Sequence, residues 1–438
     1  MGNTSSIDQV LRKAADSGDV PGVVAMAATT DGPVYEGAFG KRALPSGAPM
    51  TVDSVFWIAS MTKAITSTAA MQLVEGGKLS LDDPIKDVLP ELTSPQVLEG
   101  FDASREPKLR PAKGPITLRQ LLTHTAGFGY DIWSHDLIRY QEKKGIPGII
   151  SCQNLALTTP LKFDPGEKWD YGINIDWVGK AVEKVSGQNL ETYFRDHLFG
   201  PLGMKDTGFK LSDDRRSRLV GMHSRREDGS LEPMPFEIPQ EPEFQMGGGG
   251  LYGTAPDYLK FEQVFLHDGR FNSAQVLKSD TVKLMSQNNI GTTINVGLLK
   301  TAIPAYSNDA EFFPGMVKKW GLGFMISTEQ APTGRSPGSL AWAGLGNTYS
   351  GSIPLNKSPA SSSPSWCRSL TPRCSICLRI ARDLQGDEVA AQTVRLPFDT
   401  RQLAAPQRTG EKCHQRTFHC DRVNFHRSTV IKHQDRGM

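Results

Sequence analysis

The chain lacks the paired cysteines and long apolar runs that mark several protein classes. Of its six cysteines only Cys152 lies in the first 349 of 438 residues. That part is therefore no disulfide-stapled scaffold, and it suits a reducing compartment. No run approaches the roughly 18 apolar residues of a membrane helix, and the N-terminus lacks the basic and apolar regions of a secretory signal. We expect a cytoplasmic protein without a membrane span, and Gly2 and Ser6 leave N-myristoylation open.

Strong charge of one sign is also missing, but the formal net charge of +2 is the sum of two unlike parts. Residues 350–438 hold 14 Lys and Arg against 7 Asp and Glu, which leaves 35 against 40 in residues 1–349. The second part also holds five cysteines and no tyrosine. Its cysteines and histidines lack the spacing of a zinc site, and it has no aromatic platform for nucleic acid. We expect no metal and no nucleic acid as ligand, and we predict that residues 350–438 are a disordered tail or the product of a shifted reading frame.

Hydrophobic periodicity predicts strands at both ends of residues 1–349 and helices between them. A hairpin is predicted for residues 22–40 around the turn Asp31-Gly32, and more strands for residues 320–328 and 339–349. Helices are predicted over residues 7–17, 60–75, 115–126 with Thr117 as N-cap, 174–185, 189–199, 255–266 and 279–287. This order predicts an α/β (α+β) fold. An antiparallel sheet from residues 1–85 and 300–349 is flanked by helices, and residues 86–299 form an inserted helical lobe.

The segment Ser60-Met61-Thr62-Lys63 places a hydroxyl and an amine three residues apart at the start of a predicted helix. Residues at positions i and i+3 of a helix share one face. A serine becomes a nucleophile when a neighbouring base removes its proton, and a lysine is such a base only if burial lowers its pKa from about 10.4 toward 7. The pattern alone occurs often by chance, so its meaning depends on the rest of the chain.

Five segments in this order resemble the serine β-lactamase and penicillin-binding-protein superfamily. They are residues 53–59 with Ser60-Met61-Thr62-Lys63, the helix that ends in His124-Thr125-Ala126-Gly127, residues 164–171, the glycine run 246–251, and residues 255–258. Within it the chain is most similar to the class C branch, in particular to the family VIII carboxylesterases and the fungal lovastatin-type acyltransferases. The resemblance implies a β-lactamase/transpeptidase-like fold over residues 1–349.

The resemblance also implies roles for single residues. Ser60 would carry the acyl group, and Lys63 and Tyr171 would share its proton. The backbone N–H groups of Ser60 and Leu345 would form the oxyanion hole. Asn174, Trp342 and Gly344 would contact the substrate. Two of them depart from the β-lactamase pattern. Asn174 follows Tyr171 by three positions rather than two, and Trp342 begins Trp342-Ala343-Gly344 where β-lactamases have Lys-Thr-Gly.

Trp342 cannot pair with the carboxylate of a β-lactam, so we expect a neutral ester or thioester substrate and no cofactor. Phe128, Tyr130 and Trp133 join Trp342 as candidates for an apolar acyl pocket.

Three functions are compatible with these sequence features. The first is a carboxylic-ester hydrolase. The second is an acyltransferase that moves a short acyl group from a thioester, free or on an acyl carrier, to a polyketide-type alcohol. The third is a non-catalytic scaffold of the same fold.

Three other features are weaker signals of function. Gly334-Arg335-Ser336-Pro337-Gly338 spells the nucleophile elbow of α/β-hydrolases. Pro337 has no N–H to give to an oxyanion hole and disfavours a helix, so we predict a turn. His124 has no acidic partner in the sequence pattern, and we expect it to have a structural hydrogen bond. The run Gly247–Gly250 is either a close backbone approach to the acyl group or a hinge.

Overall fold

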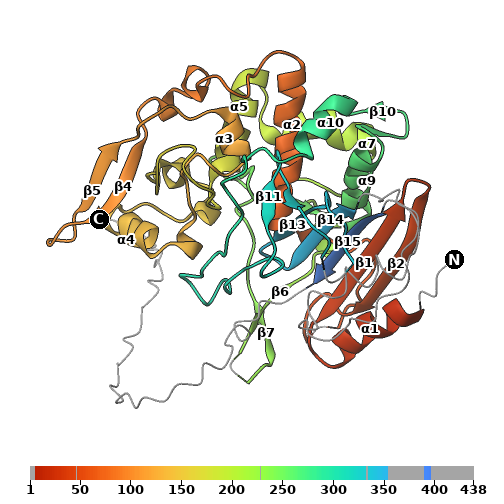
Figure 1. Cartoon of the computed structure of the whole chain (residues 1–438). Helices are drawn as coiled ribbons and strands as arrows, with labels where there is room; N and C mark the ends of the chain where they lie inside the picture. Colours follow the sequence, from red (N-terminus) through yellow and green to blue (C-terminus); the bar gives the residue numbers. More distant parts are fainter. Residues whose placement is uncertain (1–4, 46, 227, 332–333, 354–388, 396–438) are drawn as a thin grey trace, which may run out of the picture. The chain divides into compact units, whose positions relative to one another are not determined.

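An antiparallel sheet of seven strands runs in the order β11-β12-β13-β14-β15-β1-β2 (Figure 1). Its strands are β1 (Gly22–Thr29), β2 (Gly32–Gly40), β11 (Lys318–Trp320), β12 (Met325–Ser327), β13 (Leu340–Gly344), β14 (Thr348–Ile353) and β15 (Val389–Arg395). The computed structural model describes residues 5–45, 47–226, 228–331, 334–353 and 389–395, all within one unit, Met1–Gln402. The predicted hairpin and the antiparallel sheet are confirmed.

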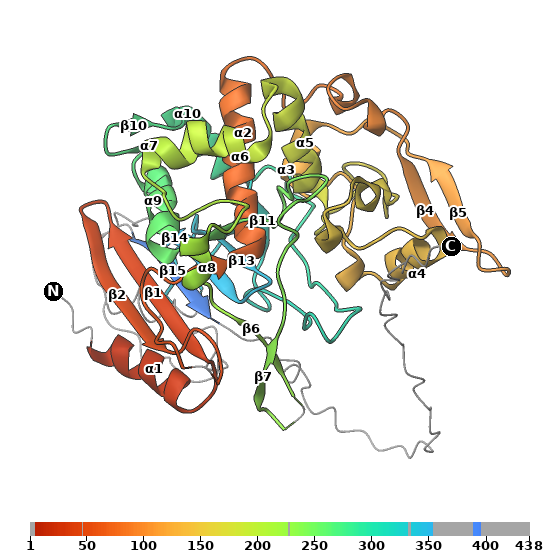
Figure 2. The same cartoon turned by 180° about the vertical axis from the view of Figure 1, so that it is seen from behind.

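Both faces of β1 are covered, because its side chains alternate between the two faces of the sheet and all of them are buried. Helix α1 (Ser5–Asp16) packs on one face of β1 and β2 (Figure 2). The residues that meet there are Ile7, Leu11 and Ala14 from the helix and Val23, Ala25 and Ala27 from β1. The alternate residues Val24, Met26 and Ala28 point into the main core, where α9 (Ala255–Leu266) packs against β1, β14 and β15.

The position of β15 differs from the expectation that the fold ends at residue 349. Strand β14 continues to Ile353, and β15 pairs with both β14 and β1. The segment Val389–Arg395 has valines near both ends, a threonine, and neither glycine nor proline, a composition that suits a strand. The N-terminal hairpin is therefore joined to the rest of the sheet and does not present an unpaired edge on the β1 side. The remaining part of the predicted tail, 354–388 and 396–438, lies outside the described residues, and its disorder or shifted reading frame stays a prediction.

Most of the regular secondary structure in the middle of the chain is helical, as predicted, although loops connect the helices over long stretches. Its helices are α3 (Leu118–Leu122), α4 (His135–Lys144), α5 (Asn174–Ser186), α6 (Leu190–Phe194), α7 (Gly200–Leu202), α8 (Asp213–Ser217) and α10 (Ser279–Met285). The same region contains three short hairpins that the sequence analysis did not predict: β4 (Gln96–Phe101) with β5 (Pro107–Pro111), β6 (Met222–Arg225) with β7 (Leu231–Met234), and β9 (Arg270–Phe271) with β10 (Ala274–Gln275). Helix α9 lies in the range assigned to the helical lobe but packs on the sheet, because its buried face meets β1.

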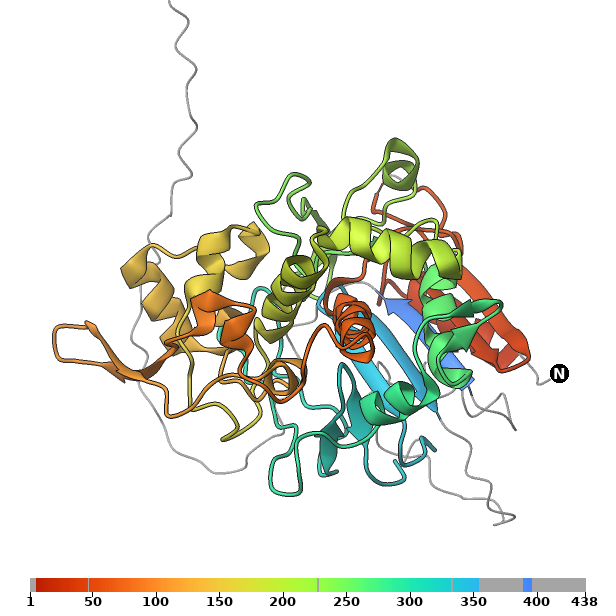
Figure 3. The same ribbon diagram turned by 90° about the horizontal axis from the view of Figure 1, so that it is seen from above.

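Helix α2 (Thr62–Glu75) lies between the sheet and α5 (Figure 3). Eleven of its fourteen residues are buried, as expected for a helix that is enclosed on all sides. Small residues such as Ala64, Ala69 and Ala70 allow the close packing. Its first turn therefore lies deep in the molecule, where a charged group is expensive. Within the described part of the chain, no helix is long and apolar enough to cross a membrane.

Candidate active site

Ser60 lies in a tight turn that leads into α2. The short strand β3 (Phe56–Trp57) pairs with β8 (Tyr252–Gly253), and residues Ala59–Met61 then form one 3₁₀ turn. Ala59 has φ = 46°, in the left-handed region, which costs a non-glycine residue about 1–2 kcal/mol. The turn is held by the Thr348 hydroxyl, which donates to the Ile58 carbonyl at 3.0 Å. Strand β14 thus fixes the backbone that presents Ser60.

Lys63 is fully buried and makes three hydrogen bonds. Its Nζ lies 3.2 Å from Ser60 Oγ, 3.0 Å from Tyr130 Oη and 2.6 Å from the Gly248 carbonyl oxygen. Loss of hydration lowers the pKa of Lys63 well below its usual value, and the charge of Asp176 opposes this effect. The buried amine therefore has a substantial neutral fraction near neutral pH.

The three partners suit a base that gains and loses a proton. The Gly248 carbonyl can only accept, so one N–H of Lys63 is always committed to it. The Tyr130 oxygen takes a second N–H. When the amine is neutral, its lone pair is left for the Ser60 hydroxyl, which can then donate to it. When the amine is charged, its third N–H points back to Ser60 Oγ. The same geometry serves the states before and after proton transfer.

Tyr171 lies next to both Lys63 and Ser60. Its hydroxyl oxygen accepts a hydrogen bond from Trp342 Nε1 at 2.9 Å, it interacts with Ser60, and its ring centroid is 4.6 Å from Lys63 Nζ. Burial raises the pKa of Tyr171, although hydrogen bonds from Ser60 and Trp342 partly offset this. The phenol is neutral at ordinary pH, so it can give a proton more readily than take one. The structure thus brings together the three residues expected from the sequence, Ser60, Lys63 and Tyr171.

Two residues of the cluster were not predicted as members of the proton network. Tyr130 follows α3, and burial raises its pKa far above the usual value. Asp176, on the first turn of α5, is fully buried, and its Oδ1 accepts the Gly248 N–H at 2.8 Å. Burial raises the pKa of Asp176, and the Lys63 charge opposes that rise. No spacing along the chain links either residue to Lys63, so the sequence held no signal for this role.

Asn174, expected to contact the substrate, is fully buried and bonds to protein groups. Its Nδ2 lies 3.0 Å from His124 Nδ1 and 3.5 Å from the Phe128 carbonyl oxygen. His124 packs edge-on against Trp320 and lies beside Tyr171, and burial holds its pKa well below the usual value. The side chains of Asn174 and His124 therefore support the wall behind Tyr171, which agrees with a structural hydrogen bond for His124.

Strand β13 passes close to the turn of Ser60. A Cβ at Gly344 would lie 2.3 Å from the Ile58 carbonyl oxygen and 3.2 Å from Ala59 Cβ. A Cβ at Gly346 would lie 3.0 Å from the Trp57 carbonyl oxygen. Leu345 lies between these two contacts, so its backbone is beside the turn that carries Ser60. The absence of a side chain at Gly344 is what lets β13 approach this turn.

The run Gly247–Gly250 is fixed to α2 and its approach. Three successive carbonyl oxygens accept hydrogen bonds: Gly247 from Thr66 Oγ1 at 2.7 Å, Gly248 from Lys63 Nζ, and Gly249 from Trp57 Nε1 at 2.7 Å. A Cβ at Gly248 would lie 2.6 Å from Asp176 Oδ2. The glycines therefore allow a close approach to protein atoms, and the hydrogen bonds argue against a hinge.

Comparison with known proteins agrees with this geometry. The sequence profile of the beta-lactamase family matches residues 7–358. The chain belongs to the beta-lactamase family.

Several relatives carry the names of acyltransferases or esterases. Acyltransferase mokF of Monascus pilosus is 34% identical over 340 residues, which cover 74% of this chain and 80% of that protein. The lovastatin esterase of Penicillium rubens is 31% identical over 353 residues, 77% of this chain and 87% of that protein. Simvastatin synthase (LovD) of Aspergillus terreus has a similar structure, with a TM-score of 0.70 and 27% identity over 90% of this chain and 92% of that one. The predicted fold and the enzyme class are confirmed.

Aromatic side chains surround the phenol of Tyr171 in this beta-lactamase family member. Trp133 lies 5.4 Å from Tyr171 between ring centroids, and Phe312 lies 5.1 Å from Trp342. Trp133 and Phe312 are both partly exposed, so they are the accessible part of this wall. Phe128, expected in the acyl pocket, instead stacks on Trp177.

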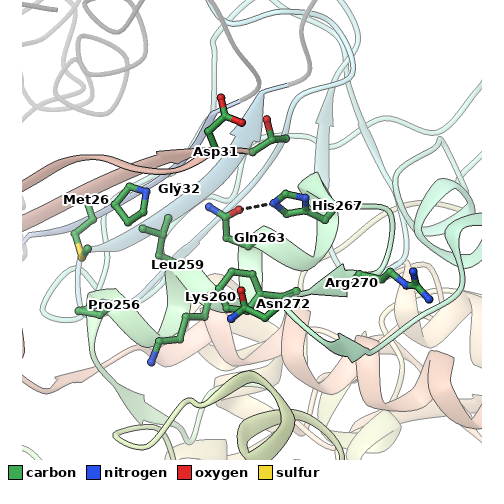
Figure 4. A pocket seen from close by; sticks show the side chains of 13 residues that line it. Met26, Asp31, Gly32, Pro256, Leu259, Lys260, Gln263, His267, Arg270 and Asn272 are labelled. Atoms are coloured by element: carbon green, nitrogen blue, oxygen red, sulfur yellow. Dashed lines mark hydrogen bonds between the residues drawn. The ribbon is translucent and has the colours of Figure 1, made fainter. Parts of the chain in front are cut away.

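Two cavities of the same fold lie apart from this cluster. One of about 700 Å³ is lined by α9 and the turn after β1, where His267 Nε2 donates to Gln263 Oε1 at 3.0 Å (Figure 4). The other, of about 740 Å³, lies in the helical region between Tyr140, Leu155 and Trp177. Neither contains Ser60, Lys63 or Tyr171, so the candidate site rests on the side-chain cluster rather than on the size of a cavity.

Proposed function

We propose that this protein is a serine esterase that forms an acyl-enzyme on Ser60 Oγ and can pass the acyl group to an alcohol. The observation that carries the proposal is the contact of 3.2 Å between Ser60 Oγ and the fully buried amine of Lys63. Burial keeps part of this amine neutral, and a neutral amine beside a hydroxyl is a general base.

In the first half-reaction Ser60 Oγ attacks the ester carbonyl while its proton moves to Lys63 Nζ. The carbonyl oxygen becomes an oxyanion, which the backbone N–H groups of Ser60 and Leu345 stabilise. When the tetrahedral intermediate collapses, the bond to the leaving oxygen breaks and that oxygen takes a proton from Tyr171. The Lys63 ammonium returns a proton to Tyr171, so the base and the phenol are restored.

In the second half-reaction an acceptor attacks the acyl-enzyme. Water yields a free acid and makes the protein an esterase, whereas an alcohol yields a new ester and makes it an acyltransferase. Relatives of similar identity carry both names, since one is a lovastatin esterase and others are methylbutanoyltransferases. We give the esterase first place because Ser60 is partly exposed, which leaves the acyl group open to water.

The substrate we propose is a small neutral ester or acyl thioester. The aromatic wall of Trp133 and Phe312 suits an apolar acyl chain, and Trp342 offers no cation for a carboxylate. An acyl-carrier thioester as donor and a polyketide-type alcohol as acceptor are the corresponding partners for transfer. The cytoplasmic location expected from the sequence stays a prediction.

A labelling experiment tests the acyl-enzyme. The protein is treated with a fluorophosphonate and, separately, with a p-nitrophenyl ester of a short acyl chain, and mass spectrometry locates the adduct. We expect the adduct on Ser60 and no turnover in Ser60→Ala. Full turnover in that variant would reject Ser60 as the nucleophile, and no adduct together with no turnover in the wild type would leave a non-catalytic scaffold. Adding an alcohol acceptor then separates the two enzymes, because only a transferase converts the acyl group into a new ester.

A further inference from the structure

We propose that Asp176 is a positioning residue, whose carboxylate fixes Gly248 against Lys63 and supplies the negative charge that balances the ammonium formed during acyl transfer. The inference rests on the proposed function, because it concerns the base in that mechanism. Asp176 is not placed to touch a substrate, since it is fully buried behind Lys63.

A short chain of contacts joins Asp176 to the base. Asp176 Oδ1 accepts the Gly248 N–H at 2.8 Å, and the carbonyl oxygen of the same residue accepts from Lys63 Nζ at 2.6 Å. Gly248 is in close contact with the carboxylate, because a Cβ there would lie 2.6 Å from Asp176 Oδ2. Gly248 therefore links the position of the Asp176 carboxylate to that of the Lys63 amine.

Few titratable groups surround Asp176 and Lys63. Among the described residues, the titratable groups that act electrostatically on Asp176 or are acted on by it are Lys63, Tyr130, Tyr171 and Cys152. Burial raises the pKa of both phenols and of the thiol, so these three stay neutral. His124, which faces Lys63 from the end of α3, is kept neutral by its lowered pKa. Asp176 is therefore the anionic partner of Lys63 within this described cluster.

The position of Asp176 at the start of α5 supports an anionic carboxylate. It lies in the first turn of that helix, where the unpaired N–H groups favour negative charge. A buried carboxylate and a buried amine titrate as a coupled pair. Without Asp176 the amine would be harder to protonate, and a less basic amine would also be a weaker proton acceptor.

Asp176→Asn tests this inference, because an amide oxygen can still accept the Gly248 N–H but carries no charge. We measure kcat/KM for a p-nitrophenyl ester against pH. The reaction needs neutral Lys63, so the acid limb of the pH profile of kcat/KM follows deprotonation of the amine. Removing the anion should shift that limb to lower pH by about one unit or more and lower the plateau. An acid limb that coincides with that of the wild type would overturn the inference.

Two further variants keep the result decisive. Gly248→Ala leaves the charge in place but pushes the carboxylate away, so it should shift the acid limb in the same direction. If Asp176→Asn does not fold, this variant alone decides, and an unshifted limb rejects the inference. Asp257→Asn is the matched control. Asp257 is a buried acid on α9 that accepts the Asp206 N–H at 2.7 Å, and its loss should lower the melting temperature without moving the limb.

The labelling of Ser60 separates this inference from the proposed function. If wild-type Ser60 forms the adduct and the acid limb does not move, only the role of Asp176 fails. If Ser60 forms no adduct, the proposed function itself fails.

Discussion

Trp342 Nε1 donates a hydrogen bond to the hydroxyl oxygen of Tyr171 at 2.9 Å, and both side chains are buried. Trp342 stands where the resemblance to β-lactamases would place a lysine. The indole N–H occupies one lone pair of the phenol oxygen, so the Tyr171 proton points away from Trp342. In the proposed mechanism, this departure from the β-lactamase motif orients the proton that the leaving group needs.

Replacing Trp342 by phenylalanine removes this hydrogen bond and keeps an aromatic ring. The expected result is a five- to tenfold lower kcat/KM, which corresponds to the net value of about 1 kcal/mol for one hydrogen bond. Trp320→Phe is the control, since Trp320 Nε1 donates to the Leu122 carbonyl at 3.1 Å and not to Tyr171. It should lower the melting temperature and leave kcat/KM closer to that of the wild type. Equal activity of Trp342→Phe and wild type would refute the orienting role.

The amine of Lys63 should account for a large part of the rate. General-base catalysis contributes about 10²–10⁴-fold, and Lys63→Ala should lose most of it. Lys63→Arg separates a base from a mere positive charge, because a guanidinium stays protonated at any ordinary pH and should be equally inactive. The exposed Lys283, paired with Asp280 at 3.2 Å, provides the control Lys283→Ala with normal turnover. An active Lys63→Arg enzyme would mean that Lys63 acts by charge alone.

The close approach of β13 to the nucleophile can be tested at Gly344. An added Cβ would lie 2.1 Å from Thr348 Oγ1 and 2.3 Å from the Ile58 carbonyl oxygen, so Gly344→Ala must push the strand away. Loss of one oxyanion donor costs about 10²–10³-fold in kcat, and we expect at least a tenfold loss here. The measurement is the rate of Ser60 acylation by a p-nitrophenyl ester in stopped flow.

Gly297→Ala is the matched control for Gly344→Ala. Among the described residues, no atom outside the chain neighbours lies within 4 Å of a Cβ at Gly297, so the acylation rate should stay that of the wild type. If Gly344→Ala acylates as fast as this control, Leu345 is not an oxyanion donor.

The sequence predicted those parts of the site that local geometry or a short motif determines. Ser60 and Lys63 meet because three residues of helix bring their side chains to one face, and Tyr171 was found through the segment that precedes it. Tyr130 and Asp176 meet Lys63 only through the tertiary fold. No spacing along the chain links them to the amine, so they could be recognised only in three dimensions.

The fold shows the same division. The β1–β2 hairpin and α9 follow from periodicity and turn residues, and the structure has them at the predicted places. Strand β15 does not, because its seven residues stand within a stretch whose composition predicts disorder. Its place between β14 and β1 depends on two strands that are far away along the chain. Composition averaged over a long stretch conceals one short strand of this kind.

Glu262 predicts how stability depends on pH. It is fully buried on α9, where loss of hydration raises its pKa to about 8 despite hydrogen bonds from Ser350 and Gly351 and the charge of Arg335. The unfolded chain releases this proton near pH 4.5, so between about pH 4.5 and 8 the folded state binds more protons and loses stability as the pH rises. The loss is on the order of a few kcal/mol.

Glu262→Gln removes this loss of stability. In thermal unfolding, the melting temperature of the variant should therefore rise relative to that of the wild type from pH 5 to 8, and the difference should stay constant above pH 8. The exposed Asp280→Asn should keep the wild-type slope. A difference between Glu262→Gln and wild type that does not change with pH would mean that Glu262 is already ionised in the folded protein.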